Sequence, residues 1–231
     1  MNALRCLSMA ALIALALPVA ALELIDLRRP TPPLGGNAEA AQAKNALCLA
    51  CHGENGITVV PMYPNLAGLP ESYLYWQMIA YKEKADPQSV MAQILGGLDD
   101  QDLRDFAAFY VSLPGDGRPA IAHPPVDTEL ASQGEQLYLH GDPARGVVPC
   151  QGCHGADARG VSTGERGWPR LRGQPEIYLT GKLNKYRAGQ DIDSTQDKIM
   201  KGVAAALSDA DVAALSAYLA GMIPPSPPES P

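Results

Sequence analysis

The chain has 231 residues and carries 18 Lys and Arg against 25 Asp and Glu, a formal net charge of −7. This length permits one large domain or two small ones. The net negative charge argues against nucleic-acid binding, which depends on neutralising phosphates with basic side chains. We therefore expect no nucleic-acid partner.

Residues 1–21 are predicted to form a secretory signal peptide. Arg5 gives a positive start, Leu7–Leu17 is an apolar run, and Val19-Ala20-Ala21 offers small residues for cleavage after Ala21. An uncleaved membrane anchor is the alternative, although the run is marginal against the roughly 20 residues that a span needs. The mature protein is thus expected to be exported to the periplasm.

Residues 22–113 are predicted to form a first all-α domain. One helix is expected over Ala38–Leu49 with Asn37 as its cap, a second after Pro70, and a third after Asp99. The positions spaced for buried faces on the second and third helices are Leu74, Met78, Tyr81, Leu103, Phe106, Ala107 and Tyr110.

Residues 114–127 are rich in Pro and Gly and are predicted to link the first domain to a second one over 128–223. Residues 224–231 form a Pro-rich tail. The second domain is predicted to open with the segment Gly134–Leu139. Its middle helix is expected to bury a face made of Leu179, Leu183 and Tyr186. A Ser208/Asp211 capping box precedes its last helix, whose predicted buried face consists of Val212, Leu215 and Leu219. No convincing run of alternating strand residues appears, so both halves are read as helical.

The pentapeptide Cys-x-x-Cys-His occurs twice, once in each half. The copies are Cys48-Leu49-Ala50-Cys51-His52 and Cys150-Gln151-Gly152-Cys153-His154. This motif is typical of c-type haem attachment, in which two thiols form thioethers with the porphyrin and the adjacent His binds the iron. The sequence therefore predicts two covalently bound haem c groups, held by Cys48, Cys51, Cys150 and Cys153, with His52 and His154 as proximal iron ligands.

Two other functions are possible for these cysteines. A zinc site that pooled the four cysteines would leave both histidines without a role. A dithiol oxidoreductase would show an alternating α/β pattern, which this chain lacks. Both are weaker than the haem interpretation.

The two halves repeat one another. The haem motifs match at an offset of 102 residues, Pro64-Asn65-Leu66-Ala67-Gly68 matches Pro169-Arg170-Leu171-Arg172-Gly173 at 105, and Leu98-Asp99-Asp100 matches Leu207-Ser208-Asp209 at 109. Two tandem domains of the same kind are therefore expected.

The repeat also selects the sixth iron ligands. Met91 and Met200 match at an offset of 109, just ahead of the last helix of each half, whereas the other methionines outside the signal have no methionine twin. Thioether ligation would raise the reduction potential and close the iron to oxygen and peroxide. Met62 is the alternative in the first domain. His123 and His140 are not related by the repeat and are assigned to surface or cap roles.

The loop after each haem motif begins with a proline. Pro64 and Pro169 are expected to hold this loop against the proximal side of the haem, where a backbone carbonyl can accept from the Nδ1–H of the ligand histidine; a plain rigid turn is the alternative. Four arginines follow the second motif and could pair with haem propionates or form a solvated basic loop. They are Arg159, Arg166, Arg170 and Arg172.

Taken together, these motifs resemble the dihaem cytochrome c4 family over almost the whole mature chain. The resemblance implies two class I-like cytochrome c domains related by a pseudo-twofold axis, with His/Met ligation at both irons. One difference is that Met91 lies ten positions after Tyr81, whereas Met200 lies fourteen after Tyr186. The loop before the first ligand methionine is thus shorter.

The expected function is electron transfer between respiratory donors and a terminal oxidase, without enzymatic activity of its own. The expected partners are redox proteins, a membrane oxidase or a bc1-type donor, that dock transiently. One alternative is the cytochrome subunit of a dehydrogenase complex, such as flavocytochrome sulfide dehydrogenase. Another is a dihaem peroxidase or thiosulfate-oxidising enzyme, which would need an open or differently ligated iron.

Overall fold

The computed structural model describes residues 34–115, 127–161, 167–190 and 194–222. The helices of the first half are α1 (Ala38–Lys44), α2 (Ala46–His52), α3 (Glu71–Lys84), α4 (Val90–Gly96) and α5 (Asp100–Ser112). Those of the second half are α6 (Thr128–His140), the 3-10 helix η2 (Pro143–Arg145), α7 (Gln151–His154), α8 (Glu176–Arg187), α9 (Thr195–Ala204) and α10 (Asp209–Gly221).

The predicted all-α class is confirmed. Within the described ranges, the only β-type pairings are two isolated bridges, Asp142 with Val147 and Val161 with Trp168. The expected signal peptide, most of the expected linker and the Pro-rich tail lie outside the described residues, so their boundaries remain predictions.

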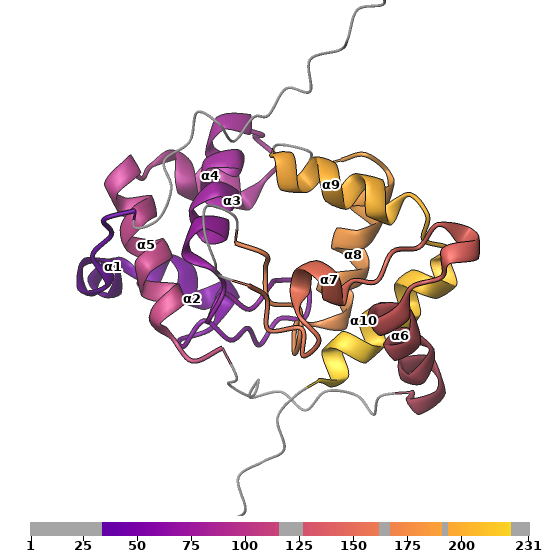
Figure 1. Ribbon diagram of the computed structural model, residues 1–231. Coiled ribbons are helices and arrows are strands. Elements are labelled where there is room, and N and C mark those ends of the chain that lie inside the picture. The colour runs from indigo at the N-terminus through magenta and orange to yellow at the C-terminus, as the bar shows by residue number, and fades with distance from the viewer. Residues whose placement is uncertain (1–33, 116–126, 162–166, 191–193, 223–231) are drawn as a thin grey trace, which may run out of the picture.

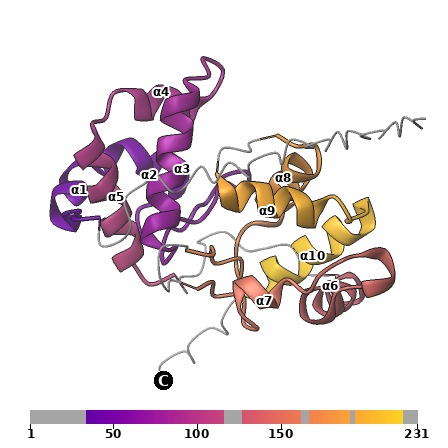
Figure 2. The ribbon, with the colours of Figure 1, turned by 45° about the horizontal axis from the view of Figure 1, so that its top comes forward.

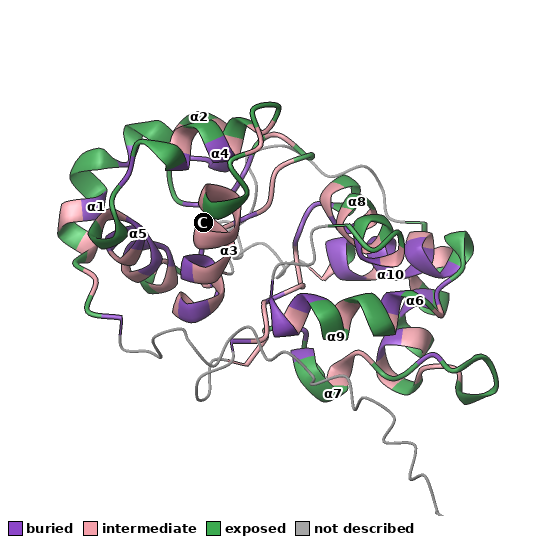
Figure 3. Ribbon diagram, turned by 90° about the horizontal axis from the view of Figure 1, so that it is seen from above, coloured by how far each residue is buried: buried purple, intermediate pink, exposed green. Residues whose placement is uncertain are grey.

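The helices gather into two groups, one from each half of the chain (Figures 1 and 2). Each group has its own buried apolar core, centred on Leu103 and Phe106 in the first half and on Tyr138 and Leu215 in the second. The helices turn their buried faces inward and leave the other faces exposed (Figure 3). The chain therefore builds two separate cores, as the repeat predicted.

The single helix expected over residues 38–49 is a wrong prediction. Asn37 does cap α1, accepting from the backbone amides of Glu39 and Ala40, but the helix breaks at Asn45. The buried Asn45 Oδ1 accepts a hydrogen bond from the Tyr110 hydroxyl at 2.6 Å. A contact with a residue 65 positions away thus coincides with the break, and α2 continues beyond the expected end to His52.

The last helix of each half begins with a capping box. Asp99 and Asp102 form the box of α5, and the predicted Ser208/Asp211 box of α10 is confirmed. Each pair satisfies two amide groups that a helix start leaves without partners. The boxes therefore fix where α5 and α10 enter their cores.

α10 is a core helix of the second half and is buried along most of its length. No single described helix is long and apolar enough to cross a membrane. α9 and α10 together meet the length and composition of a span, but they are bent by 118°.

The first helix of each half packs across the last, α1 on α5 and α6 on α10. A glycine makes each close approach possible. A Cβ placed on Gly36 would lie 2.1 Å from the carbonyl oxygen of Arg104, and one on Gly134 would lie 2.0 Å from that of Ala214. A side chain at either position would force the helices apart.

We expect Gly134→Ala to destabilise the second half by about 1–3 kcal/mol, because the added methyl group overpacks the crossing of α6 and α10. Gly181→Ala is the matched control, since its position in α8 is exposed and its added Cβ meets no atom within 4 Å. The free energy of unfolding of that variant should rise by about 0.5–1 kcal/mol, because Ala has a higher helix propensity than Gly. Urea unfolding of the holoprotein measures the free energy of unfolding of both variants. An equal change in the two variants would contradict the interpretation that Gly134 is closely packed.

Arg145 of η2 ties the haem-motif loop of the second half to α10. Its guanidinium donates to both carboxylate oxygens of Asp211, at 2.6 and 3.0 Å, and its Nε donates to Asp142 at 2.6 Å. The paired guanidinium lowers the pKa of Asp211 to about 2. The charged form of this nearly buried carboxylate is thus favoured by folding.

The stability linked to Asp211 should be present above about pH 5 and lost as the pH falls toward 2, because its folded pKa lies below the unfolded one. In Arg145→Gln that pKa should return toward its ordinary value. We therefore expect the variant to be less stable at neutral pH and to lose less stability between about pH 5 and 2. Thermal unfolding across this range tests the expectation, and an unchanged pH profile would contradict it.

Candidate haem sites

Both haem motifs lie at helix ends. Cys48 and Cys51 belong to α2, which ends at His52, whereas Cys150 caps the short α7, which contains Cys153 and ends at His154. Residues three apart in a helix lie on the same face, so each motif presents its two thiols together. The four thiols are free of disulfides. They are therefore available for thioether bonds.

Each candidate ligand histidine is held by the proline carbonyl that the sequence singled out. The Nδ1 of His52 lies 2.9 Å from the Pro64 carbonyl oxygen, and that of His154 lies 2.8 Å from the Pro169 carbonyl oxygen. Because a carbonyl only accepts, Nδ1 carries the hydrogen and Nε2 carries the lone pair. The expected carbonyl contact is confirmed in both halves.

The two Nε2 atoms are buried and have no hydrogen-bond partner among the described residues. The side chains of His52 and His154 are 5% and 4% exposed, and burial lowers the pKa of both imidazoles, so the neutral form is favoured. A buried polar atom without a partner is costly unless something binds it. A neutral imidazole with a free Nε2 is a metal ligand, so this arrangement fits a haem iron.

The two candidate sixth ligands, expected just ahead of the last helix of each half, lie in short helices that the sequence did not predict. Met91 is in α4, capped by Ser89, and Met200 is in α9, capped by Ser194. Met91 and Cys48 pack against the core of the first half, and Met200 and Cys150 against that of the second. Met62, the alternative in the first half, is 61% exposed.

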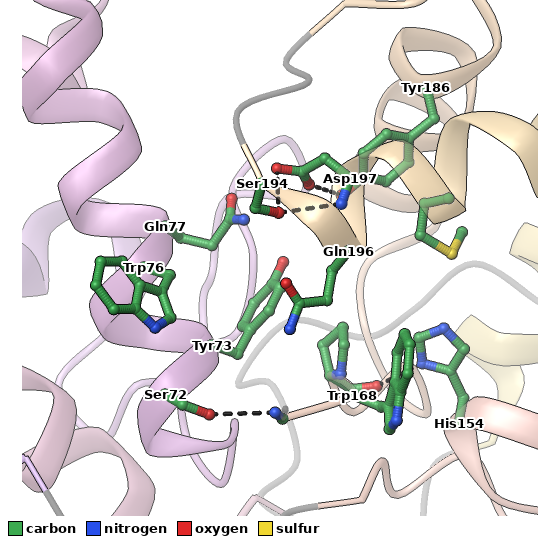
Figure 4. A pocket seen from close by; sticks show the side chains of 13 residues that line it. Ser72, Tyr73, Trp76, Gln77, His154, Trp168, Tyr186, Ser194, Gln196 and Asp197 are labelled. Atoms are coloured by element: carbon green, nitrogen blue, oxygen red, sulfur yellow. Dashed lines mark hydrogen bonds between the residues drawn. The ribbon is translucent and has the colours of Figure 1, made fainter. Parts of the chain in front are cut away.

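A pocket in the second half brings together His154 and Met200 (Figure 4). One wall comes from α3 of the first half, through Ser72, Tyr73, Trp76 and Gln77. Burial and the neighbouring Tyr178, Tyr186 and Asp197 keep the pKa of Tyr73 well above its usual value. The second site is thus enclosed by both halves of the chain.

The sequence analysis missed an aromatic residue beside each ligand histidine. The ring of Tyr63 lies 6.0 Å from that of His52, and the ring of Trp168 lies 6.4 Å from that of His154, between ring centroids. The two residues directly precede Pro64 and Pro169 and match at the offset of 105. An aromatic-proline pair repeated at this spacing was the signal that could have identified them.

Three of the arginines after the second motif form hydrogen bonds or ion pairs within their own loop. Arg159 pairs with Asp157 at 3.0 Å, Arg172 donates to the Asp157 carbonyl, and the buried Arg170 donates to the Arg172 carbonyl. Arg166 and His123 lie outside the described residues, and His140 is exposed at the end of α6. Pairing of these arginines with haem propionates remains a prediction.

Comparison with known proteins gives consistent results. The family model described as cytochrome c matches residues 38–114 and again 131–222. Cytochrome c4 of Pseudomonas aeruginosa is 38% identical over 187 residues, covering 81% of this chain and 89% of that protein. A thiosulfate dehydrogenase electron acceptor of Thiomonas intermedia is 35% identical, covering 83% of this chain and 85% of that protein.

A solved structure is similar over the same extent. Reduced recombinant cytochrome c4 from Pseudomonas stutzeri superposes with a TM-score of 0.71 at 38% sequence identity. The match covers 80% of this chain and 98% of that one. Both halves are therefore included in the likeness.

Proposed function

This chain belongs to the dihaem cytochrome c4 family and carries two covalently bound haem c groups, and we propose that it transfers electrons in the periplasm between respiratory donors and a terminal oxidase. The single observation that carries the proposal is the pair of buried imidazoles, each with Nδ1 on a proline carbonyl and Nε2 without a partner. Two such sites suit two fixed irons rather than one catalytic centre.

The proposed role of each residue is set by the donor atom in its side chain. Cys48, Cys51, Cys150 and Cys153 would form the thioethers, the Nε2 atoms of His52 and His154 would bind the irons, and the sulfur atoms of Met91 and Met200 would be the remaining iron ligands. When bound, each haem supplies a one-electron iron couple. The carbonyls of Pro64 and Pro169 hold the imidazoles in one orientation and increase their basicity.

These roles leave the chain no substrate to activate. With Met91 and Met200 as ligands in addition to the histidines, neither iron would offer a place for oxygen or peroxide. The protein would then set the potential, the spacing and the docking surface for the one-electron chemistry that the haems would supply. This is the work of a carrier rather than of an enzyme.

The periplasmic location is proposed from the predicted signal peptide over residues 1–21. After its cleavage, the four remaining cysteines are those of the two haem motifs. Transient docking to a membrane oxidase or a bc1-type donor would then occur outside the cytoplasm.

A second candidate is an electron acceptor for a thiosulfate-oxidising dehydrogenase. It is favoured by the likeness to the Thiomonas intermedia protein of that name, which extends over most of both chains. The two candidates differ in the donor and not in the haem chemistry. Reduction by a purified thiosulfate dehydrogenase, compared with reduction by a bc1-type complex, distinguishes them.

The purified holoprotein should contain two haems per chain, show the near-infrared methionine–iron band at both irons, and bind neither carbon monoxide nor cyanide rapidly. Met91→Ala and Met200→Ala should each remove one of the two contributions to this band and open one iron to carbon monoxide. Met62→Ala is the control and should keep both, because its side chain is exposed.

A full band in Met91→Ala together with a reduced band in Met62→Ala would reassign the first sixth ligand. Rapid binding of carbon monoxide by the unmodified protein would overturn the proposal of a pure carrier. It would favour the peroxidase or thiosulfate-oxidising alternative.

A further inference from the structure

The sequence repeat breaks at a buried position between the two halves. Gln174 stands just before Pro175, at the start of α8, and its partner at the offset of 105 is Leu69, just before Pro70 at the start of α3. Both side chains are 3% exposed. A buried amide where the other domain has a hydrocarbon needs hydrogen bonds to offset its lost hydration.

Gln174 finds these bonds in the other half of the chain. Its Oε1 accepts from the backbone amide of Asn65 at 2.9 Å, and its Nε2 donates to the backbone carbonyl of Asn65 at 2.9 Å. The Asn65 side chain returns the contact by donating to the Gly173 carbonyl at 2.8 Å. These three bonds join the second domain to the loop after the first haem motif.

That loop includes the peptide group that holds His52. The carbonyl of the Pro64–Asn65 peptide accepts from His52 Nδ1 at 2.9 Å, and the N–H of the same peptide donates to Gln174 Oε1. Hydrogen bonds to the two ends of one amide polarise each other. A chain of three groups therefore leads from Gln174, through one planar peptide, to the imidazole of the other domain.

The second haem site is built differently at the same place. The Pro169–Arg170 peptide also accepts from its histidine, His154, at 2.8 Å. Its nitrogen packs over Gly160 of its own domain, where a Cβ would lie 2.7 Å away. The side chain of Leu69, the repeat partner of Gln174, has no group that could accept from an amide. The contact from Gln174 to the first site thus has no side-chain equivalent from Leu69 to the second.

We propose that Gln174 of the second domain is a positioning residue for the haem of the first, acting through the Pro64–Asn65 peptide on His52. By accepting from that peptide, Gln174 makes the carbonyl a better acceptor and increases the electron density on the imidazole. A more basic imidazole favours ferric iron, so the contact lowers the reduction potential of the first haem. This inference rests on the proposed function, in which His52 Nε2 binds the iron.

Gln174→Leu tests the inference, because it installs the residue of the other repeat. We expect the reduction potential of the first haem to rise and that of the second to stay unchanged. The potentials are read by a redox titration followed by NMR, in which the signals of the two ligand methionines assign each step. The Nδ1 proton of His52 should also exchange faster with solvent.

Ser72→Ala is the control for loosening of the interface. It removes another hydrogen bond between the domains, from the Gly167 amide to Ser72 Oγ at 3.2 Å, without touching the peptide that holds His52. The first haem should keep its potential in this variant, and only the first haem is compared, because Ser72 lines the pocket of the second. Gln174→Asn retains an amide that is shorter by one methylene, and it should shift the first potential in the same direction by less.

The outcomes distinguish a failure of the role of Gln174 from a failure of the proposed carrier function. An unchanged first potential in Gln174→Leu and in Gln174→Asn, with both methionine–iron bands present, overturns the role of Gln174 and leaves the carrier function intact. An equal shift in Ser72→Ala also overturns it, since any loosening of the interface would then suffice. If Gln174→Leu fails to fold, Gln174→Asn decides alone. Loss of His/Met spectra in the unmodified protein overturns the proposed function and this inference together.

Discussion

Two imidazole nitrogens, buried and without a hydrogen-bond partner, constrain the rest of this structure. A bond to a haem iron would satisfy each Nε2, and the proline carbonyl opposite fixes which nitrogen is free to make it. The helix that ends at each histidine also presents the two cysteines of its motif. Small domains bury little surface on their own. We therefore expect the two haems to be parts of the two cores as well as redox groups.

The contact between the domains makes the two sites unequal. Pro64 and Pro169 hold their histidines in the same way, but Gln174 reaches from the second domain to the peptide behind His52. The pocket of the second site is in turn lined on one side by residues of α3 from the first domain. Each domain thus completes the surroundings of the other, although the sequence repeat would suggest two independent copies. We expect this difference in surroundings to give two otherwise similar haems different reduction potentials.

Local patterns were enough to predict much of this arrangement. The haem motifs, the Ser208/Asp211 capping box and the carbonyl contacts of the ligand histidines depend on spacings of a few residues and on the repeat. The features that were missed depend on distant contacts. The break at Asn45 involves Tyr110, and the bond from Gln174 to Asn65 spans 109 residues. The short helices around Met91 and Met200 were missed because seven and ten residues give only a weak periodic signal.

The most direct test of the structural role of haem is the helix content of the chain without it. A variant in which Cys48, Cys51, Cys150 and Cys153 are all alanine, produced where haem is not attached, would be compared with the holoprotein by circular dichroism and amide hydrogen exchange. The account predicts a large loss of helix signal and little protection around His52 and His154. Native helicity with native protection in the haem-free chain would contradict it.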